Sequence, residues 1–341
     1  MITLNQETFK SQEVLSSINF IRNSDLIFIA TLSTADIESL GIKEYRVVEQ
    51  NNELLTILNL KFKLKENDIV YCHTDYVESL FEVLKNFEFS NIKLISSQSD
   101  RKVGKKIFSK KSACISTWYS TNVIFEDINL VPLPLGIAPY RNTKSAIIKD
   151  FEYVDETIVR NKYIYANFSL YTNYFHRFGA MRHALKKLNL KIIDNIEYDL
   201  YTKALREYKL TLCPWGNGLD THRFWEAIYS GSIPVTKRHK MFESFNDLPM
   251  ILLNSYKEIG SIDNQIKFED FDLIKLKIDW WIQKIYSNKV ESSKPNVEIY
   301  LNDDLFNFTI NHLYKLKVHN KRKKDRLTFL RKIHEKLVFF I

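Results

Sequence analysis

Short apolar runs of strand length alternate with helical patterns along the first part of the chain. After the run at 69–73, for example, Asp75 opens a helical pattern that continues through Leu80, Phe81 and Leu84. This alternation predicts βα units and a mainly parallel sheet. The predicted strands are 26–30, 45–48, 69–73, 92–96, 113–117 and 130–133.

The segment with the most structural signals lies at 210–236, LTLCPWGNGLDTHRFWEAIYSGSIPVT. Its pattern predicts a strand, a Gly-rich turn, a helix and a second strand. Gly216 and Gly218 allow the turn to approach a ligand closely, and Asp220 or Thr221 can cap the helix. Phe224, Ala227 and Ile228 form its buried stripe, and Gly231 ends it. Such βαβ units bind ligands beyond the carboxyl ends of their strands.

The remaining pattern extends this α/β arrangement. Further strands are expected at 162–168, 192–193 and 249–253, and helices up to about residue 188, at 198–207 and over much of 262–287. Nine of the fifteen Gly and Pro residues fall in two windows, 132–139 and 214–234, so the first window is also a specific turn.

A chain of 341 residues exceeds the usual size of one core. The segment 140–160 is polar and lacks firm periodicity, which places a boundary near residue 150. We therefore expect an N-terminal Rossmann-like domain at 1–150, a second one at 151–300, and C-terminal helices with a basic amphipathic tail at 301–341.

Composition narrows the class of protein. The apolar fraction of 45% and charged fraction of 26% are typical of globular proteins, and the net charge of +8 favours anionic partners. Cys72, Cys114 and Cys213 are widely spaced in apolar runs, which indicates buried free thiols in a reducing compartment. The N-terminus lacks a signal-peptide core, so we expect a cytoplasmic protein.

His222, Arg223 and Glu226 lie at the start of the predicted helix of 210–236. First-turn amides and a cation pair suit phosphate, whereas a carboxylate one turn deeper can accept hydrogen bonds from ribose hydroxyls. The alternative is that Arg223 and Glu226 form an ordinary surface pair.

GNGLDTHRFWEAIYSGSIPV resembles the donor-binding segment of exostosin-like glycosyltransferases, above all the ribitol xylosyltransferase-like branch with its GNGxDTHRxWEALxxGxIPI pattern. A looser likeness is to the α1,3-fucosyltransferases, whose acidic-Lys pair is replaced here by His222 and Arg223. Trp118, Asn122 and Gly136 match a further segment of the family in type, with a structural role.

The resemblance implies a GT-B fold, in which two Rossmann-like domains face a cleft and C-terminal helices return to the first domain. It also implies a nucleotide-sugar donor and an inverting reaction. Arg177, after the first strand of the second domain, matches the family's phosphate-contacting loop; a solvated helix-start Arg is the alternative. The expected donor-binding residues are Arg177, Gly216, Asn217, Gly218, Asp220, Thr221, His222, Arg223 and Glu226.

The base that deprotonates the acceptor hydroxyl is expected from the N-terminal domain. Asp75 is the first choice, then His73 and Asp100, because all three follow strands of that sheet. Their alternative roles are a helix cap, a packed strand end and a turn former. Arg223 is expected to contribute to catalysis by stabilising charge on the leaving phosphate.

No metal-binding motif occurs, and Asp303 and Asp304 resemble a helix cap rather than an isolated DxD, so neither metal nor cofactor is expected. Together with the resemblance, this predicts a metal-independent transferase that uses a UDP-sugar such as UDP-xylose and a glycan or polyol-phosphate acceptor. The alternatives are a GDP-fucose-dependent enzyme and a non-catalytic GT-B subunit that binds nucleotide or glycan. No nucleic-acid recognition motif is present.

The tail from residue 315 to residue 341 contains ten Lys and Arg residues and two acidic ones. Leu327, Leu330, Ile333 and Leu337 recur at helical spacing beside the cations. This pattern predicts a helix that lies on an anionic membrane surface, at the inner face of the membrane. The alternative is a closing helix whose apolar stripe packs inside the fold.

Overall fold

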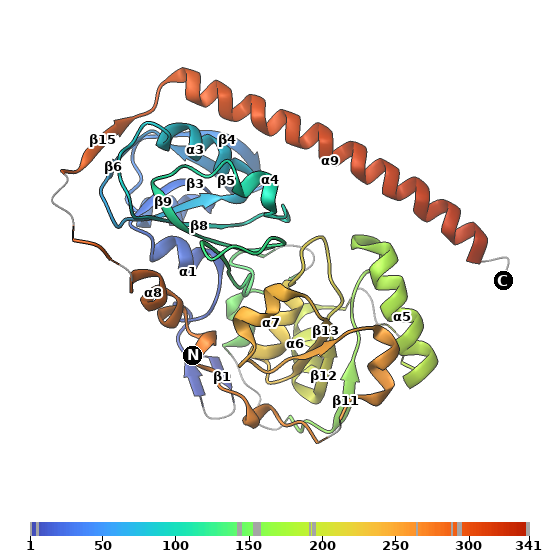
Figure 1. The fold of residues 1–341 in the computed structure, drawn as a ribbon. Coiled ribbons are helices and arrows are strands. Elements are labelled where there is room, and N and C mark those ends of the chain that lie inside the picture. The colour runs from blue at the N-terminus through green and yellow to red at the C-terminus, as the bar shows by residue number, and fades with distance from the viewer. Residues whose placement is uncertain are drawn as a thin grey trace. The chain divides into compact units, whose positions relative to one another are not determined.

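The computed structural model describes residues 2–4, 7–141, 145–152, 158–190, 192, 196–263, 265–287, 289–291 and 295–338. The chain divides into two compact units, each made of two stretches of sequence. Unit 1 comprises Met1–Asn23 and Ser120–Asn288, and unit 2 comprises Ser24–Tyr119 and Lys289–Ile341. Both contain a sheet with helices against it, so the predicted α/β class is confirmed (Figure 1).

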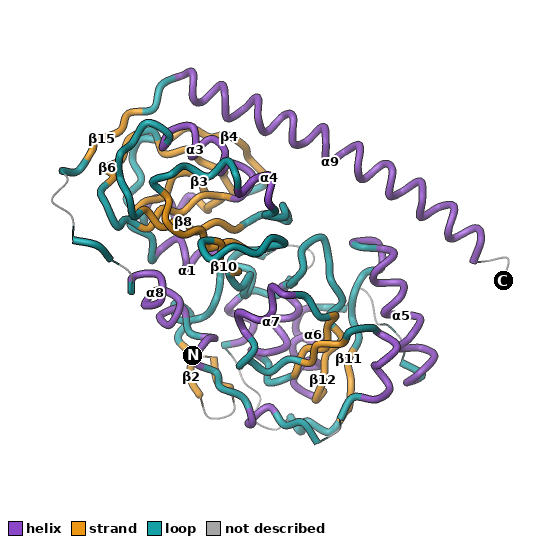
Figure 2. The backbone as a smooth tube through the Cα atoms, viewed as in Figure 1, coloured by secondary structure: helices purple, strands orange, loops and turns teal. Residues whose placement is uncertain are grey.

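The sheet of unit 1 is parallel throughout and has the strand order β11-β12-β13-β14. Its strands and the helices of this unit follow the predicted order (Figure 2), although Ile192 is not in a strand and residue 193 lies outside the described residues. The helix predicted over much of 262–287 is too long, because the α-helix covers only Ile278–Tyr286 and short 3-10 turns precede it. The elements are β1 (Ile2–Leu4), β2 (Glu7–Phe9), α1 (Ser17–Arg22), β10 (Leu130–Pro132), β11 (Lys162–Tyr165), α5 (Tyr174–Leu188), α6 (Tyr198–Glu207), β12 (Tyr208–Leu212), α7 (His222–Tyr229), β13 (Ile233–Lys237), β14 (Ile251–Leu253) and α8 (Ile278–Tyr286).

Helix α7 connects β12 to β13, which confirms the predicted βαβ unit. Gly231 ends the helix with a φ of 77°, a left-handed conformation that glycine adopts without steric cost. The sequence predicts that only one apolar stripe of α7 is buried, but more of the helix is buried than that. Every residue from Phe224 to Tyr229 is buried, so polar side chains of α7 also lie inside the unit.

The N-terminal segment of the chain packs against α7. The Leu15 N–H donates to the Tyr229 hydroxyl at 2.8 Å, and that hydroxyl donates to the carbonyl oxygen of Leu276 at 2.6 Å. The Leu15 carbonyl accepts from the Ile137 N–H at 2.8 Å. These buried bonds explain why residues 1–23 belong to unit 1. The predicted contiguous domains at 1–150 and 151–300 differ from this division.

The sheet of unit 2 is mixed. Strands β3, β7 and β8 are parallel, as predicted, whereas β5 is antiparallel to both β3 and β4. Within the unit the strand order is β9-β8-β7-β3-β5-β4. The elements are β3 (Leu26–Ser33), α2 (Thr34–Ser39), β4 (Tyr45–Asn51), β5 (Leu54–Asn59), β6 (Lys61–Leu64), β7 (Ile69–His73), α3 (Val77–Leu84), β8 (Ile92–Ser97), α4 (Lys105–Phe108) and β9 (Ile115–Ser120).

The C-terminal residues return to the strands of unit 2. Strand β15 (Val297–Tyr300) pairs with β6, and the long helix α9 (Asp303–Val338) follows it. The cap of α9 is Asn302, whose side-chain oxygen accepts from the Leu305 N–H at 3.1 Å, rather than Asp303 or Asp304. No helix among the described residues is both long and apolar enough to cross a membrane.

The three cysteines, Cys72, Cys114 and Cys213, are buried free thiols, as predicted. The GT-B arrangement of two domains around a cleft stays a prediction.

Gly136 is expected to be irreplaceable in unit 1. It has a φ of 71°, and a Cβ there would lie 2.1 Å from the carbonyl oxygen of Leu15. Gly136→Ala should therefore cost roughly 2–4 kcal/mol of unfolding free energy, since both backbone strain and a backbone clash oppose it. Urea unfolding measures the loss.

Gly179→Ala is the matched control, because a Cβ at that position of α5 meets nothing within 4 Å. In a helix this change should stabilise by about 0.5–1 kcal/mol. Equal stability of the two variants would contradict the described path of the 136 turn.

Candidate functional site

The Gly-rich turn before α7 is held by close packing. A Cβ on Gly218 would lie 2.5 Å from the side-chain oxygen of Asn122, and this oxygen accepts from the Leu219 N–H at 2.9 Å. Asn122 itself has a φ of 56°, which asparagine tolerates better than most residues. The absence of a side chain at Gly218 thus leaves room for the Asn122 amide, which is consistent with a structural role for Asn122. Asn217, between the two glycines, is exposed.

Arg177 on α5 supports the same turn. Its Nε donates to the carbonyl oxygen of Trp215 at 3.1 Å, and its Nη1 donates to that of Ser169 at 2.7 Å. The side chain is 4% exposed, and its Nη2 lies 3.1 Å from the place of a Cβ on Gly216. Arg177 therefore orders the loop by bonding backbone carbonyls, and its contact with phosphate stays a prediction.

Asp220 ties α7 to the other Gly- and Pro-rich window. Its Oδ2 accepts from the Leu135 N–H and from the indole N–H of Trp225, each at 2.8 Å. The side chain is 2% exposed. The cap position of α7 is Thr221, whose side chain makes no capping bond. The expected capping by either side chain is therefore wrong, because Asp220 is bonded to the turn at 132–139 instead.

His222, the first residue of α7, bonds to the same turn. Its Nδ1 lies 2.8 Å from the carbonyl oxygen of Gly136. Because a carbonyl oxygen only accepts, Nδ1 carries a proton in this contact. The hydrogen bond fixes the orientation of the ring at the start of the helix.

Glu226 is buried, although the sequence indicated a side chain that faces a ligand. It is 1% exposed, its Oε1 accepts from the Ala146 N–H at 3.0 Å, and its Oε2 accepts from the Tyr201 hydroxyl at 2.5 Å. Burial raises the pKa of this carboxyl to about 7, against the opposing effect of Arg223. Donors from the protein therefore already bond to both carboxylate oxygens. The expected hydrogen bond between Glu226 and a ribose stays a prediction.

Arg223 lies one turn before Glu226 in α7. Its Nη2 donates to the side-chain oxygen of Asn167 at 3.3 Å, and its guanidinium carbon lies 5.9 Å from the centre of the Tyr201 ring. The negative charge that Tyr201 and Glu226 can carry outweighs the effect of burial and raises the pKa of the guanidinium. Arg223 is therefore a permanent cation inside unit 1.

Several buried polar atoms at and near this cation have no hydrogen-bond partner among the described residues, and two of them belong to the start of α7. They are Nε of Arg223 and the hydroxyl of Thr221. Both residues lie at the start of α7, where backbone amides and the helix dipole also favour negative charge. This arrangement of donors can bind an anion such as phosphate.

Tyr201, Asn167 and the amide of Ala146 complete this cluster and were not expected as site residues. Tyr201 gave no signal, because it lies in an ordinary amphipathic helix, α6. Asn167 stands in the loop after β11, NFSLYTNYFHR, where only Arg177 was singled out. A side chain that contacts α7 from another element cannot be recognised from spacing alone.

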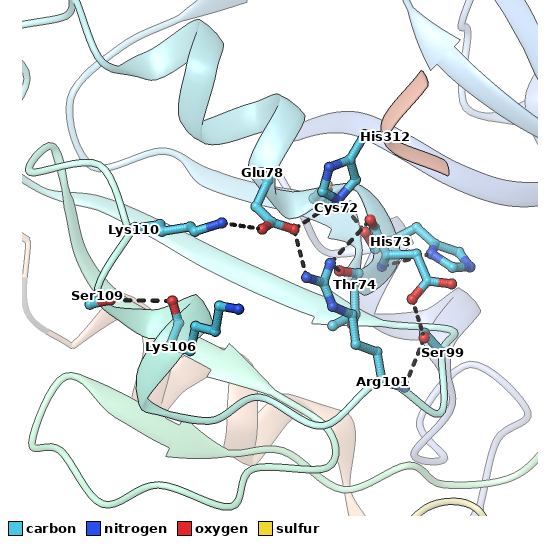
Figure 3. A network of polar contacts seen from close by, with 11 residues as sticks. Cys72, His73, Thr74, Glu78, Ser99, Arg101, Lys106, Ser109, Lys110 and His312 are labelled. Carbon is cyan, nitrogen blue, oxygen red and sulfur yellow. Dashed lines mark hydrogen bonds and ion pairs between the residues drawn. The ribbon is translucent and has the colours of Figure 1, made fainter. Parts of the chain in front are cut away.

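The candidate bases lie in unit 2. Asp75 and Asp100 follow β7 and β8, as predicted, whereas His73 is the last residue of β7 itself. These strands are parallel neighbours, so their carboxyl ends meet at one edge of the sheet. The Ser99 hydroxyl donates to Oδ1 of Asp75 at 2.7 Å, and the Asp75 N–H donates to Nδ1 of His73 at 3.2 Å (Figure 3). Burial lowers the pKa of His73. Asp75 is half-buried and Asp100 is exposed.

Residues 185–259 match the family model described as the RXYLT1 C-terminal domain. The matched range contains the Gly-rich turn and α7, and it supports a glycosyltransferase-like origin of this segment. The fucosyltransferase likeness stays a prediction. No curated protein matches the chain.

Among solved structures, a crystal structure of a GtfA/B complex is similar, with a TM-score of 0.33 and 10% identity. The similarity covers 77% of this chain and 58% of that chain, so the present chain spans little more than half of it. We draw no functional conclusion from a likeness of this size.

The burial of Glu226 predicts a pH dependence of stability. Its pKa is about 7 in the folded state against 4.5 ordinarily, so the folded protein keeps a proton that the unfolded chain releases between these values. Stability from this group therefore falls as pH rises from about 4.5 to 7, by on the order of 3 kcal/mol. Glu226→Gln should remove that decline, as measured by urea unfolding at about pH 5 and pH 8.

Glu243→Gln is the control, because it changes an exposed carboxylate of the same unit. Its stability should follow the wild-type pH profile. A Glu226→Gln variant that differs from wild type by the same amount at both pH values would show that this carboxyl is not the source of the dependence.

Proposed function

We propose that this chain is a glycosyltransferase that moves a sugar from a nucleoside diphosphate to a hydroxyl of a cell-surface glycan or its precursor. The observation that carries the proposal is the half-buried Arg223 cation, whose buried Nε has no hydrogen-bond partner among the described residues. It follows a Gly-rich turn at the start of α7, within the segment that matches the RXYLT1 C-terminal domain. A UDP-sugar such as UDP-xylose is the favoured donor.

Sugar transfer of this kind develops negative charge on the leaving diphosphate. Arg223 and the first-turn amides of α7 supply positive charge and donors that are already oriented, so stabilisation requires little rearrangement. In this proposal His222 donates through its Nε2 as an imidazolium, because its Nδ1 proton is bonded to Gly136. In the proposed mechanism these groups replace a divalent cation, and the reaction is metal-independent. Arg177 contributes indirectly, since it holds the carbonyls of Ser169 and Trp215 that shape the loop.

The acceptor hydroxyl must lose a proton as it attacks the anomeric carbon. We propose Asp75 as the base, because its carboxylate is half-buried and its Oδ1 is oriented by the Ser99 hydroxyl. His73 and Asp100 are the remaining candidates. The proposal includes a GT-B arrangement, in which a base from one domain faces a donor on the other and direct displacement inverts the anomeric centre.

A panel of nucleotides tests the donor. UDP should raise the melting temperature of the purified protein more than GDP, CMP or ADP, because a ligand that binds only the folded state stabilises it by mass action. EDTA should leave the shift, and transfer from the matching donor, unchanged. Arg223→Gln should abolish the shift, since it removes the cation at the start of α7; differential scanning fluorimetry measures it.

Arg182→Gln is the control, because it removes the same charge from an exposed position of α5. A response to GDP alone would favour the fucosyltransferase alternative. Binding of UDP without turnover of any UDP-sugar would favour a non-catalytic subunit. No response to any nucleotide, or loss of transfer on chelation, would contradict the proposed donor site.

Asp75→Asn should lower the rate of transfer by about 10²–10⁴-fold while nucleotide affinity stays unchanged, because the amide keeps the contact with Ser99 but cannot take a proton. Single-turnover kinetics and calorimetry separate the two effects. Asp36→Asn is the matched control, since Asp36 likewise accepts from a serine hydroxyl, that of Ser33 at 2.6 Å, in unit 2. A fully active Asp75→Asn variant would transfer the role to His73 or Asp100.

A further inference from the structure

The first turns of α9 are fixed to unit 2. Thr309 and Leu313 are buried, and Nε2 of His312 lies 2.8 Å from Oε2 of Glu78 on α3 (Figure 3). One turn further, Lys317 pairs with Glu49 of β4 at 2.8 Å. The helix is therefore held by both apolar and charged contacts up to about Lys317.

The second part of α9 is different, because its side chains are mostly exposed. From residue 321 to residue 336, only Thr328, Arg331, His334 and Glu335 are half-buried, and the others are exposed. This part contains eight Lys and Arg residues and two acidic ones. The cations are Lys321, Arg322, Lys323, Lys324, Arg326, Arg331, Lys332 and Lys336.

An apolar row accompanies these cations. Leu327, Leu330 and Ile333 recur every three residues, so they share one side of the helix, and they are 46%, 40% and 41% exposed. Leu337 would continue the row, but its side chain lies outside the described part. An exposed apolar row on a folded protein marks an interaction surface more often than it serves stability.

We propose that this surface, residues 321–336 of α9, binds an anionic lipid bilayer and lies in the plane of its headgroups. The cations match the negative surface, each contributing about 1 kcal/mol near it, and the apolar row inserts into the interface. The sequence pattern indicated such a helix, and the alternative of a packed closing helix does not fit the exposure of the row.

Two other partners fit the surface less well. In a homodimeric coiled coil the row would have to extend over several heptads. Here it continues toward the N-terminus as Lys323 and Arg326, whose like charges would oppose each other across a parallel dimer. Nucleic acid would satisfy the cations, but its phosphates would leave Leu327, Leu330 and Ile333 in water.

Vesicle flotation of the full chain tests the proposal. The protein should float with vesicles of phosphatidylcholine and phosphatidylglycerol at low salt and stay behind with phosphatidylcholine alone. Replacement of Leu327, Leu330 and Ile333 by Ser should weaken binding roughly tenfold or more, because it removes the inserted surface. Replacement of the four cations at 321–324 by Gln should weaken it by roughly a hundredfold or more and reduce its salt dependence.

Two controls match these variants. Ile128→Ser removes an apolar side chain, 91% exposed, that lies outside α9, and it should leave binding nearly unchanged. The charge control replaces four exposed cations elsewhere by Gln, namely Lys102, Lys105, Lys106 and Lys186. It should retain most of the binding, and circular dichroism should show that all variants keep their helix content.

Several results would overturn the proposal. Equal binding to neutral and anionic vesicles would exclude the charge match, and equal losses in the charge control would reduce the effect to net charge. A dimer seen by sedimentation that the Ser variant abolishes would assign the row to a second copy of the chain. Tighter binding of duplex DNA than of vesicles would assign the surface to nucleic acid.

Discussion

The stability of unit 1 depends on hydrogen bonds to the buried polar side chains of α7 and of the turn before it. A buried polar group without a partner costs about 1–3 kcal/mol, so partners must come from other segments. Asp220, Glu226 and Tyr229 all bond to backbone amides, those of Leu135, Ala146 and Leu15. The Gly- and Pro-rich window at 132–139, the segment of Ala146 and the N-terminal segment are therefore positioned by their hydrogen bonds to α7 and its preceding turn.

The same burial sets the charge of the candidate site. Glu226 is a buried carboxyl one turn after the half-buried Arg223 cation, and burial raises the pKa of Glu226 to about 7. Near neutral pH the carboxyl is thus partly protonated, and the charge of Arg223 is only partly cancelled. An anion bound beside Arg223 would raise the Glu226 pKa further, since like charges disfavour its ionised form. Anion binding and proton uptake at this pair are therefore linked.

The sequence predicts the elements of this fold better than their surroundings. The strand, turn and helix of 210–236 are defined by local signals, Gly216, Gly218 and Gly231, and they form where expected. Helical spacing places Arg223 and Glu226 on one side of α7 but contains no information on what covers that side. The covering groups come from Tyr201 and Ala146, far away in the chain. Strands β5 and β6 were missed because short, polar-flanked runs resemble loops.

Unit 2 joins its candidate base and its long helix through one carboxylate. Glu78 binds Arg101, Lys110 and His312, and the hydrogen bonds from these partners hold its pKa well below the usual range, against the opposing effect of burial. Arg101 also donates to the backbone carbonyl of Asp75 at 3.2 Å. A change that loosens the start of α9 would therefore reach the loop of Asp75 through Glu78 and Arg101. The surface at 321–336 begins one turn beyond Lys317, the last residue of α9 described above as pairing with unit 2. Its substitution therefore separates an effect on membrane binding from an effect on the candidate base.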